Sequence, residues 1–424
     1  MKSIQFIQIS FLLIIGLYQN GITASALQDK MLDEYGIDVI GFTEARQGWR
    51  LQNTPHQKDI SISELRLQME ITGEWDLATI NFKGDFYGDL VDESINADVR
   101  SLNVLVSPFG FMDIRGGRQM LTWGTGDLLF INDFFPKDWV SFFTGRDDEY
   151  LKAPSDALRI SVYTPIFNTE LIYVPMVNSS VYIDGARLSY WNRFQNKISG
   201  SNYILHNENR DNFPDDGEFA GRLYRNMGSM ETSIYGFYGF WKTPEGFNPS
   251  SGKLIYPRLS AGGASVRAPI FGGIGNMEGG YYYSSDNTDG DNPIIRNSEV
   301  RFLAGFEREI SSNLTAGIQY YGEWMQDYDE YLKLNSSLPN DEFRQLITLR
   351  LRKLLLNQNL ILSFFTYYSP SDNDAYIRPK VKYKVTDAIA LELGVNIFVG
   401  EHQHTFFAQF EDNNNAYGSL RWSF

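Results

Sequence analysis

The chain has 424 residues, no cysteine and a formal net charge of −15. The absence of cysteine excludes a disulfide framework, and the acidic excess argues against a nucleic acid partner, because nucleic acid is itself a polyanion. Aromatic residues make up 15% of the sequence and the mean hydropathy is −0.30. The chain therefore combines many aromatic side chains with a large amount of wetted surface.

The first 26 residues have the three parts of a secretory signal peptide. Lys2 supplies a positive start, an apolar run follows between residues 6 and 18, and Ala24-Ser25-Ala26 matches an A-x-A cleavage site. The apolar run is shorter than the roughly 20 residues that a spanning helix needs. We therefore expect residues 1–26 to direct export and residues 27–424 to form one mature domain.

From about residue 38 onward, segments of alternating apolar and polar residues are separated by turns. Leu65, Leu67 and Met69 share one face of such a segment, and charged or polar residues occupy the positions between them. Short turns alternate with longer polar loops, as in barrels that cross a membrane with β-strands. The expected short turns are residues 74–76, 108–110, 165–167, 227–230, 269–272, 310–313, 355–358 and 386–388. The expected loops are residues 51–59, 89–97, 125–156, 176–216, 243–256, 285–298, 327–341, 370–374 and 401–414.

This spacing predicts an all-β fold, a transmembrane antiparallel up-and-down β-barrel of about eighteen strands. Sixteen strands would follow if the segments near residues 98–107 and 168–176 are not strands. An even number of strands places both termini on one side, which we expect to be the periplasmic side, with the longer loops extracellular. Helical patterns are absent outside the longest loops.

The longest aromatic loop, residues 125–156, follows a segment that we expect to end as a strand at Trp123, an interfacial anchor. The loop carries Asp127, Asp133, Phe134, Phe135 and Trp139. An aromatic loop of this length packs against something. Two interpretations stay open here: the loop folds inward and constricts the pore, or it caps the barrel mouth.

The lumen is where polar residues of a channel-forming barrel line the water path. Basic residues share one face of each of two late segments and occupy two earlier positions, and acidic residues lie on other segments. The predicted pore-lining basic residues are Arg115, Arg159, Arg344, Arg350, Arg352, Arg378, Lys380, Lys382 and Lys384. The predicted pore-lining acidic residues are Glu64, Glu70, Asp85, Glu307 and Glu392. These charges either select ions and dipolar solutes or pair with each other and fill the lumen.

The last ten residues form an amphipathic strand that ends on an aromatic residue. Ala416, Gly418, Leu420, Trp422 and Phe424 share one face. This end resembles the closing strand of bacterial outer-membrane β-barrels. The resemblance implies that Phe424 and Trp422 belong to the signal that the barrel-assembly machinery reads.

A second resemblance lies in residues 111–139. The pattern GRQ-x-x-x-WG, from Gly117 to Gly124, is followed by Asp127, Asp133, Pro136 and Asp138. It is similar to the pattern of the alginate-export family and related porin-like barrels. The resemblance implies an eighteen-stranded monomeric barrel and a structural role for Arg118 and Trp123 at the strand end, without implying a substrate.

Enzymatic and metal sites find little support in the sequence. The four histidines, His56, His206, His402 and His404, fall in or beside expected loops, and none accompanies a serine in the middle of a strand. We therefore expect no catalytic residues, no metal site and no cofactor.

Together these patterns predict an outer-membrane, porin-like channel for passive diffusion of a small hydrophilic solute, with anionic and sugar-like solutes as candidates. A loop-plugged structural or interaction barrel and a transporter of hydrophobic compounds are the alternatives. The expected partners are outer-membrane lipids, the barrel-assembly machinery, periplasmic chaperones and the solute, and a monomer is favoured.

Overall fold

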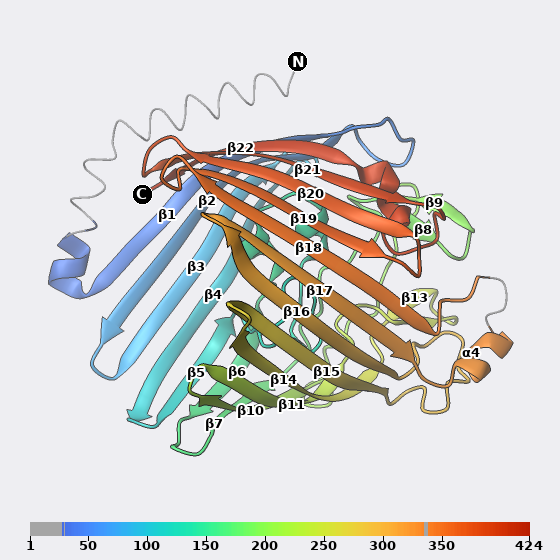
Figure 1. Ribbon diagram of the computed structural model, residues 1–424, viewed down its shortest axis with the longest axis horizontal. Helices are drawn as coiled ribbons and strands as arrows, with labels where there is room; N and C mark the ends of the chain where they lie inside the picture. The colour runs from blue at the N-terminus through green and yellow to red at the C-terminus, as the bar shows by residue number, and fades with distance from the viewer. Residues whose placement is uncertain (1–27, 29, 335–337) are drawn as a thin grey trace.

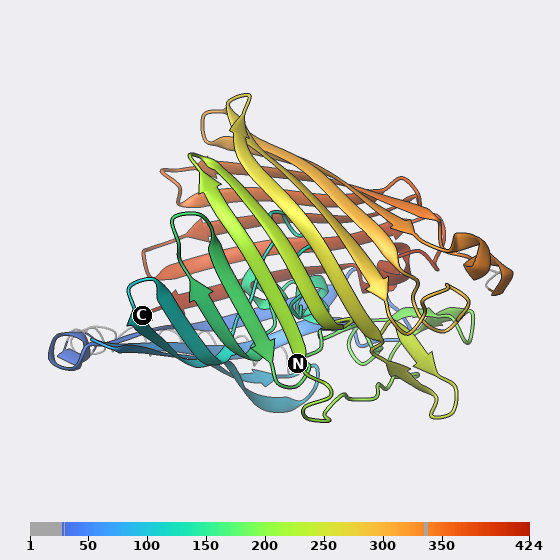
Figure 2. The same ribbon diagram turned by 90° about the horizontal axis from the view of Figure 1, so that it is seen from below.

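A computed structural model describes residue 28, residues 30–334 and residues 338–424, so the predicted signal peptide lies outside the described residues. Eighteen antiparallel strands form one closed barrel, and β1 pairs with both β2 and β22 to complete the ring (Figures 1 and 2). The strands are β1 (Ile37–Arg50), β2 (Ile60–Trp75), β3 (Ala78–Asp89), β4 (Ser94–Phe109), β5 (Met112–Gln119), β6 (Ser155–Val162), β7 (Asn168–Val174), β10 (Glu218–Met227), β11 (Met230–Phe240), β14 (Arg258–Ile270), β15 (Gly273–Ser284), β16 (Glu299–Ser311), β17 (Leu314–Met325), β18 (Phe343–Leu355), β19 (Leu360–Ser369), β20 (Asp374–Lys384), β21 (Ile389–Gly400) and β22 (Asn415–Ser423). The predicted fold class and strand number are confirmed.

Each strand has an apolar outer face and a polar inner face, because successive side chains point to opposite sides of the sheet. On β4, Leu102 is 53% exposed on the outside and Asn103 is 3% exposed on the inside. On β21, Leu393 is 66% exposed and Asn396 is fully buried. An exposed apolar outer face of this kind suits contact with lipid.

The two ends of the barrel differ in the length of their connections. One end carries short turns, such as those between β2 and β3 and between β14 and β15, and the other end carries the long segments. The connection expected at residues 89–97 is shorter, four residues spanning 90–93, and the one expected at residues 370–374 spans 370–373. The beginning of β1 and the chain end lie together at the short-turn end, where the backbones of Gly41 and Phe424 exchange two hydrogen bonds of 2.9 Å (Figure 1).

Exposed aromatic side chains gather near both ends of the strands. Trp75, Phe109 and Phe271 lie at the short-turn end, and Trp49 and Trp324 lie at the end with the long connections. Two such girdles match the two interfaces of a membrane, where aromatic rings are favoured.

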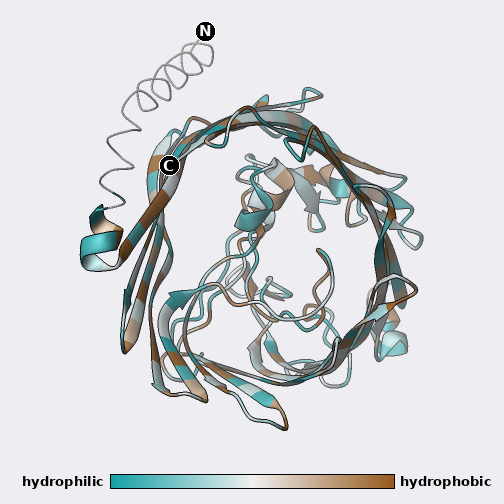
Figure 3. Cartoon of the chain, turned by 60° about the vertical axis from the view of Figure 1, so that its left-hand side comes forward, coloured by the Kyte–Doolittle hydropathy of each residue, from teal (hydrophilic) through white to brown (hydrophobic). Residues whose placement is uncertain are grey.

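Segments that connect the strands fold into the interior of the ring (Figure 3), and a buried apolar cluster lies there. It is built from the segment between β5 and β6, residues 120–154, here called the inner loop, and from inward-facing residues of the wall. The β7–β10 and β21–β22 connections add Leu188, Tyr190, Phe407 and Phe410. The inner loop contains α3 (Trp139–Thr144) and the 3-10 helix η1 (Asp148–Leu151). Within residues 30–334 and 338–424, no helix has the length and apolar character needed to cross a membrane.

The other long connections carry short elements of their own. They are the hairpins β8 (Tyr190–Asn192) with β9 (Lys197–Ser199) and β12 (Gly246–Asn248) with β13 (Lys253–Ile255), the helix α4 (Tyr328–Leu334) and the 3-10 helix η2 (Ala408–Asn413).

Candidate pore constriction

The first half of the inner loop is fixed to the wall near β7, β11 and β15. Phe134 packs on the Phe237 ring, with ring centroids 5.1 Å apart. The Glu278 carboxylate accepts hydrogen bonds from the backbone N–H of Gly126 at 2.7 Å and from the Asn132 side chain at 3.1 Å. The loop therefore folds into the lumen, the first of the two interpretations that the sequence left open.

The expected strand end at Trp123 is wrong. β5 ends at Gln119, and Trp123 is buried inside the barrel, where its Nε1–H donates to Glu170 at 2.8 Å. The polar end of the indole ring needs a partner when buried, and the lumenal carboxylate of Glu170 provides one. Arg118 lies on the outward face and pairs with Asp156 of β6 at 2.7 Å.

The second half of the inner loop crosses to the opposite wall. The Asp138 carboxylate caps α3 by accepting from the backbone N–H of Ser141 at 2.8 Å. Phe143 then packs edge-on against Tyr376 and Phe398, with both centroid distances at 5.3 Å. The loop is thus held at both ends and has a defined position across the lumen.

The acidic residues of β2 and β3 face the lumen as part of a neutralised network. Arg66 pairs with Glu64 and with Asp85, each at 2.9 Å, and Arg146 of the inner loop donates from Nε to Glu64 at 2.9 Å. All four side chains are buried or nearly so. For these residues the structure has the lumen-filling arrangement, in which each charge has a partner.

The other predicted acidic residues lie in three different settings. Glu70 pairs with Lys83 at 3.4 Å, and Glu392 pairs with Arg46 at 3.1 Å. Glu307 forms no ion pair with any residue that the structure describes.

The basic residues of β18 and β20 face the inner loop. Arg350 donates from Nη2 to Asp127 at 2.7 Å, Arg378 pairs with Asp148 at 2.9 Å, and Lys380 lies 3.5 Å from the same Asp148 carboxylate. Burial would raise the pKa of Asp148, but Arg378 and Lys380 outweigh it and hold that pKa well below its usual range. Asp148 therefore binds to the wall as a charged group, and Asp127 binds to the wall through Arg350.

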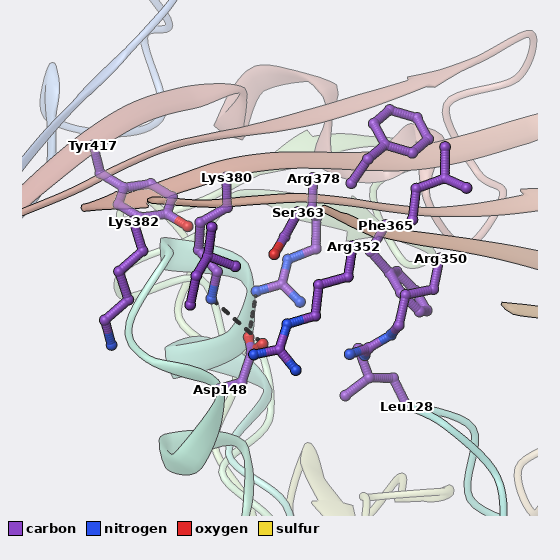
Figure 4. Close-up of a pocket in the computed structure, with 13 residues that line it drawn as sticks. Leu128, Asp148, Arg350, Arg352, Ser363, Phe365, Arg378, Lys380, Lys382 and Tyr417 are labelled. Atoms are coloured by element: carbon purple, nitrogen blue, oxygen red, sulfur yellow. Dashed lines mark hydrogen bonds and ion pairs between the residues drawn. The ribbon is translucent and has the colours of Figure 1, made fainter. Parts of the chain in front are cut away.

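A cavity of about 260 Å³ lies between the inner loop and this wall, and Figure 4 shows Arg378 and Lys380 of the wall directed toward Asp148 of the inner loop. We call it the basic cavity. Its charged lining consists of one carboxylate, Asp148, and five cations, Arg350, Arg352, Arg378, Lys380 and Lys382. Within the described part of the chain, Arg352 and Lys382 form no ion pair. Arg350 also pairs with Asp127 and Lys380 with Glu392, which lie outside the lining. The net positive charge of the cavity therefore comes from Arg352 and Lys382, the two cations free to meet a solute.

A second cavity of about 260 Å³ lies on the other side of Arg350, and we call it the mixed cavity. Its charged lining balances Arg267 and Arg350 against Asp127 and Glu307. Arg350 lines both cavities, so the Asp127–Arg350 pair lies between them. Burial raises the pKa of Asp127 above its usual value, against the opposing effect of Arg350.

Some predicted residues lie away from these cavities. Arg344 pairs with Asp372 at 2.9 Å, at the end with the long connections. Lys384 is the exposed last residue of β20, and Arg115 and Arg159 lie opposite each other on β5 and β6. In the inner loop, Asp133 pairs with Lys137 at 3.0 Å in a buried contact, Phe134 and Phe135 are buried anchors, and Trp139 is half-buried. None of these residues lines the basic cavity.

The sequence interpretation missed several lumenal residues. It assigned no lumenal role to Asp148 or to Arg46, Arg146 and Arg421. Arg421 pairs with Glu44 at 3.0 Å across the β1–β22 closure. The alternation on β1 and β22 places Arg46 and Arg421 on the inner face and was a usable signal. Nothing in the sequence indicated the partners of Asp148 and Arg146.

The chain end and the histidines complete the predicted features. The rings of Trp422 and Phe424 contact each other on the outer face, tilted by 39° with centroids 5.2 Å apart. His402 and His404 stack at 5.7 Å in the last loop. Over the described residues, no group of three or more histidine, aspartate or glutamate side chains is arranged to hold a metal ion.

No protein-family description and no curated protein sequence matches the chain. Solved structures do match its shape. Acinetobacter baumannii OccAB1 is 12% identical, with 92% of this chain and 96% of that chain covered and a TM-score of 0.53. Pseudomonas aeruginosa OccD3 (OpdP) is 9% identical, with 92% and 91% covered and a TM-score of 0.54.

A. baumannii OccAB3 is 8% identical, with 92% and 98% covered and a TM-score of 0.54. The fold is that of porin-type outer-membrane β-barrels. The comparisons do not point to the alginate-export family, so that resemblance in residues 111–139 stays at the level of the barrel fold.

Proposed function

We propose that the protein is an outer-membrane channel through which small hydrophilic anions, sugar acids among them, diffuse passively. The observation that carries the proposal is the basic cavity, where five cations face one carboxylate beside the inner loop. Rings of basic side chains favour anions in pores, because a fixed positive potential raises the local anion concentration.

The contacts of the inner loop support carboxylates as the solute class. Asp127 and Asp148 are carboxylates, and the wall cations already bind them at hydrogen-bonding distance. A solute carboxylate that enters the basic cavity meets Arg352 and Lys382, which have no competing partner among the described residues. The solute then passes as its carboxylate moves from one cation to the next, and no cofactor takes part.

The outer-membrane location and the orientation belong to the same proposal. The apolar outer faces, the two aromatic girdles and the likeness to outer-membrane barrels support insertion there. Both termini then lie in the periplasm, and Trp422 with Phe424 serves as the assembly signal. The lipids, the assembly machinery, the chaperones and a monomeric state are proposed on the same grounds.

A loop-plugged interaction barrel is the second candidate, and one observation favours it. The inner loop reaches from Glu278 on β15 to Tyr376 on β20 and to Glu64 on β2, so it contacts much of the circumference. A plug of this kind would leave no continuous path beside the loop. Solute uptake separates the two candidates.

The test uses three solutes with one carbon skeleton: gluconate, glucose and glucosamine. The full chain is refolded into liposomes, and uptake of each labelled solute is measured against protein-free liposomes. The proposal predicts uptake in the order gluconate, glucose, glucosamine. Arg352→Glu with Lys382→Glu should invert the order of the two charged sugars. Equal uptake of the three overturns anion preference, and no uptake by a folded barrel favours the plugged candidate.

A further inference from the structure

A separate pair of cations lies on β5 and β6, outside the basic cavity. Arg115 and Arg159 are directly opposite in the strand register, and Ile172 of β7, which faces inward and is buried, continues the same rung. Directly opposed residues have Cβ atoms about 4.5–5.5 Å apart, and like charges in that arrangement are destabilising. We call these two residues the arginine pair. A negative partner would offset this repulsion.

The residues in register with the arginine pair on the neighbouring strands include no carboxylate. Leu105 of β4 is opposite Arg115, and Ile172 is opposite Arg159. The Nε atoms of both arginines are buried and have no hydrogen-bond acceptor among the described residues. A buried donor left without an acceptor costs free energy. An acceptor from outside the chain would remove this cost.

The neighbouring carboxylates are engaged elsewhere. One rung closer to the short turns, Asp113 accepts from the Ser107 hydroxyl at 2.6 Å and from the Tyr163 hydroxyl at 3.0 Å. Glu170 accepts from Trp123 Nε1 at 2.8 Å. Neither carboxylate forms an ion pair with the arginine pair in the part of the chain that the structure describes. A diffusible anion would supply the ion pair that these carboxylates do not form with the arginine pair.

We propose that the arginine pair is a binding site for a divalent, tetrahedral oxyanion of the phosphate type. One guanidinium group satisfies a carboxylate by itself through two parallel hydrogen bonds. Two adjacent guanidinium groups present donors in two planes and carry two positive charges, which match the several oxygens and the double charge of hydrogen phosphate. The site lies on β5 and β6, whereas the basic cavity is lined by β18, β19, β20, β22 and the inner loop.

The experiment measures binding on the folded full chain in detergent micelles, so its outcome does not depend on whether the channel conducts. Inorganic phosphate is titrated and its ³¹P resonance is followed, at constant ionic strength. Four proteins are compared: the unchanged chain, Arg115→Gln with Arg159→Gln, Arg352→Gln with Lys382→Gln, and the combination of all four substitutions. The two double variants remove the same charge from two separate places. Heat-modifiable electrophoretic mobility checks that each protein is folded.

The proposal predicts that Arg115→Gln with Arg159→Gln weakens phosphate binding by about tenfold or more, because charge-assisted hydrogen bonds to two guanidinium groups are lost. The same loss is expected whether these substitutions are made in the unchanged chain or in the Arg352→Gln, Lys382→Gln variant. Arg115→Lys with Arg159→Lys should keep the charge and recover only part of the affinity, because lysine lacks the planar fork. An unchanged phosphate affinity in the glutamine variant overturns the site. Full recovery by lysine overturns the bidentate geometry. If the glutamine variant does not fold, the lysine variant and each single substitution supply the same comparison.

Discussion

Asp148 is the carboxylate whose removal should change ion selection most. It is the one acid in the lining of the basic cavity, where it faces five cations. Asp148→Asn removes its charge and keeps an oxygen that accepts from Arg378. Arg378 also keeps its contact with the Phe142 ring, 4.1 Å from its centroid, so we expect the inner loop to stay in place.

The size of the effect follows from Coulomb's law. For an ion passing about 6 Å from the carboxylate in water, removing one charge changes its energy by about 0.7 kcal/mol. The change favours anions and disfavours cations, so the anion-to-cation permeability ratio should rise about tenfold without screening. At about 0.1 M salt the Debye length is about 10 Å, which reduces the rise to about fourfold.

Reversal potentials in a salt gradient measure this ratio in planar bilayers. Glu149→Gln is the matched control, because it removes the same charge from the next residue of the same loop, where the carboxylate lies 3.5 Å from Lys83 and outside the basic cavity. The control should change the ratio much less. An unchanged ratio in Asp148→Asn, or an equal change in both variants, would refute the view that ions pass beside Asp148.

Three further predictions concern the inner loop. Because burial raises the pKa of Asp127, lowering the pH from neutral should protonate this group and increase anion preference, and Asp127→Asn should remove that pH dependence of the reversal potential. Phe134→Ala should cost about 3 to 5 kcal/mol of loop anchoring, seen as faster trypsin cleavage within residues 120–154 while the barrel stays heat-modifiable. Gly145→Ala should also speed that cleavage, because Gly145 has a φ of 88° and an added Cβ would lie 2.4 Å from the Tyr417 ring. Gly110→Ala, with no atom within 4 Å of its Cβ, should leave cleavage unchanged.

The strands were predictable from the sequence because a barrel strand has two different environments. The two-residue period of a strand is enough to interpret an alternation such as that of Leu391, Glu392 and Leu393. The strand number followed from the turns. Trp123 was misplaced because the stretch before it, which begins with Gly116 and Gly117, gives no apolar alternation that would mark the end of the strand at Gln119.

The inner loop and its contacts were only partly predictable. Its length and aromatic content indicated packing. However, Phe143 contacts Phe398, which lies 255 positions later in the sequence, and no local pattern encodes that contact. The same holds for Asp148 and Arg378, which are 230 positions apart. Which lumenal charges are free therefore depends on the folded loop, whereas the presence of charges on the inner face depends on the strand period alone.

The central claim is that an open, anion-preferring path runs beside the inner loop. Single-channel recording of the refolded full chain, with a salt gradient across a planar bilayer, tests it most directly. The account predicts a steady conductance whose reversal potential is shifted from zero toward the equilibrium potential of the anion. A folded, heat-modifiable barrel that gives no conductance, or a reversal potential on the cation side, would contradict it.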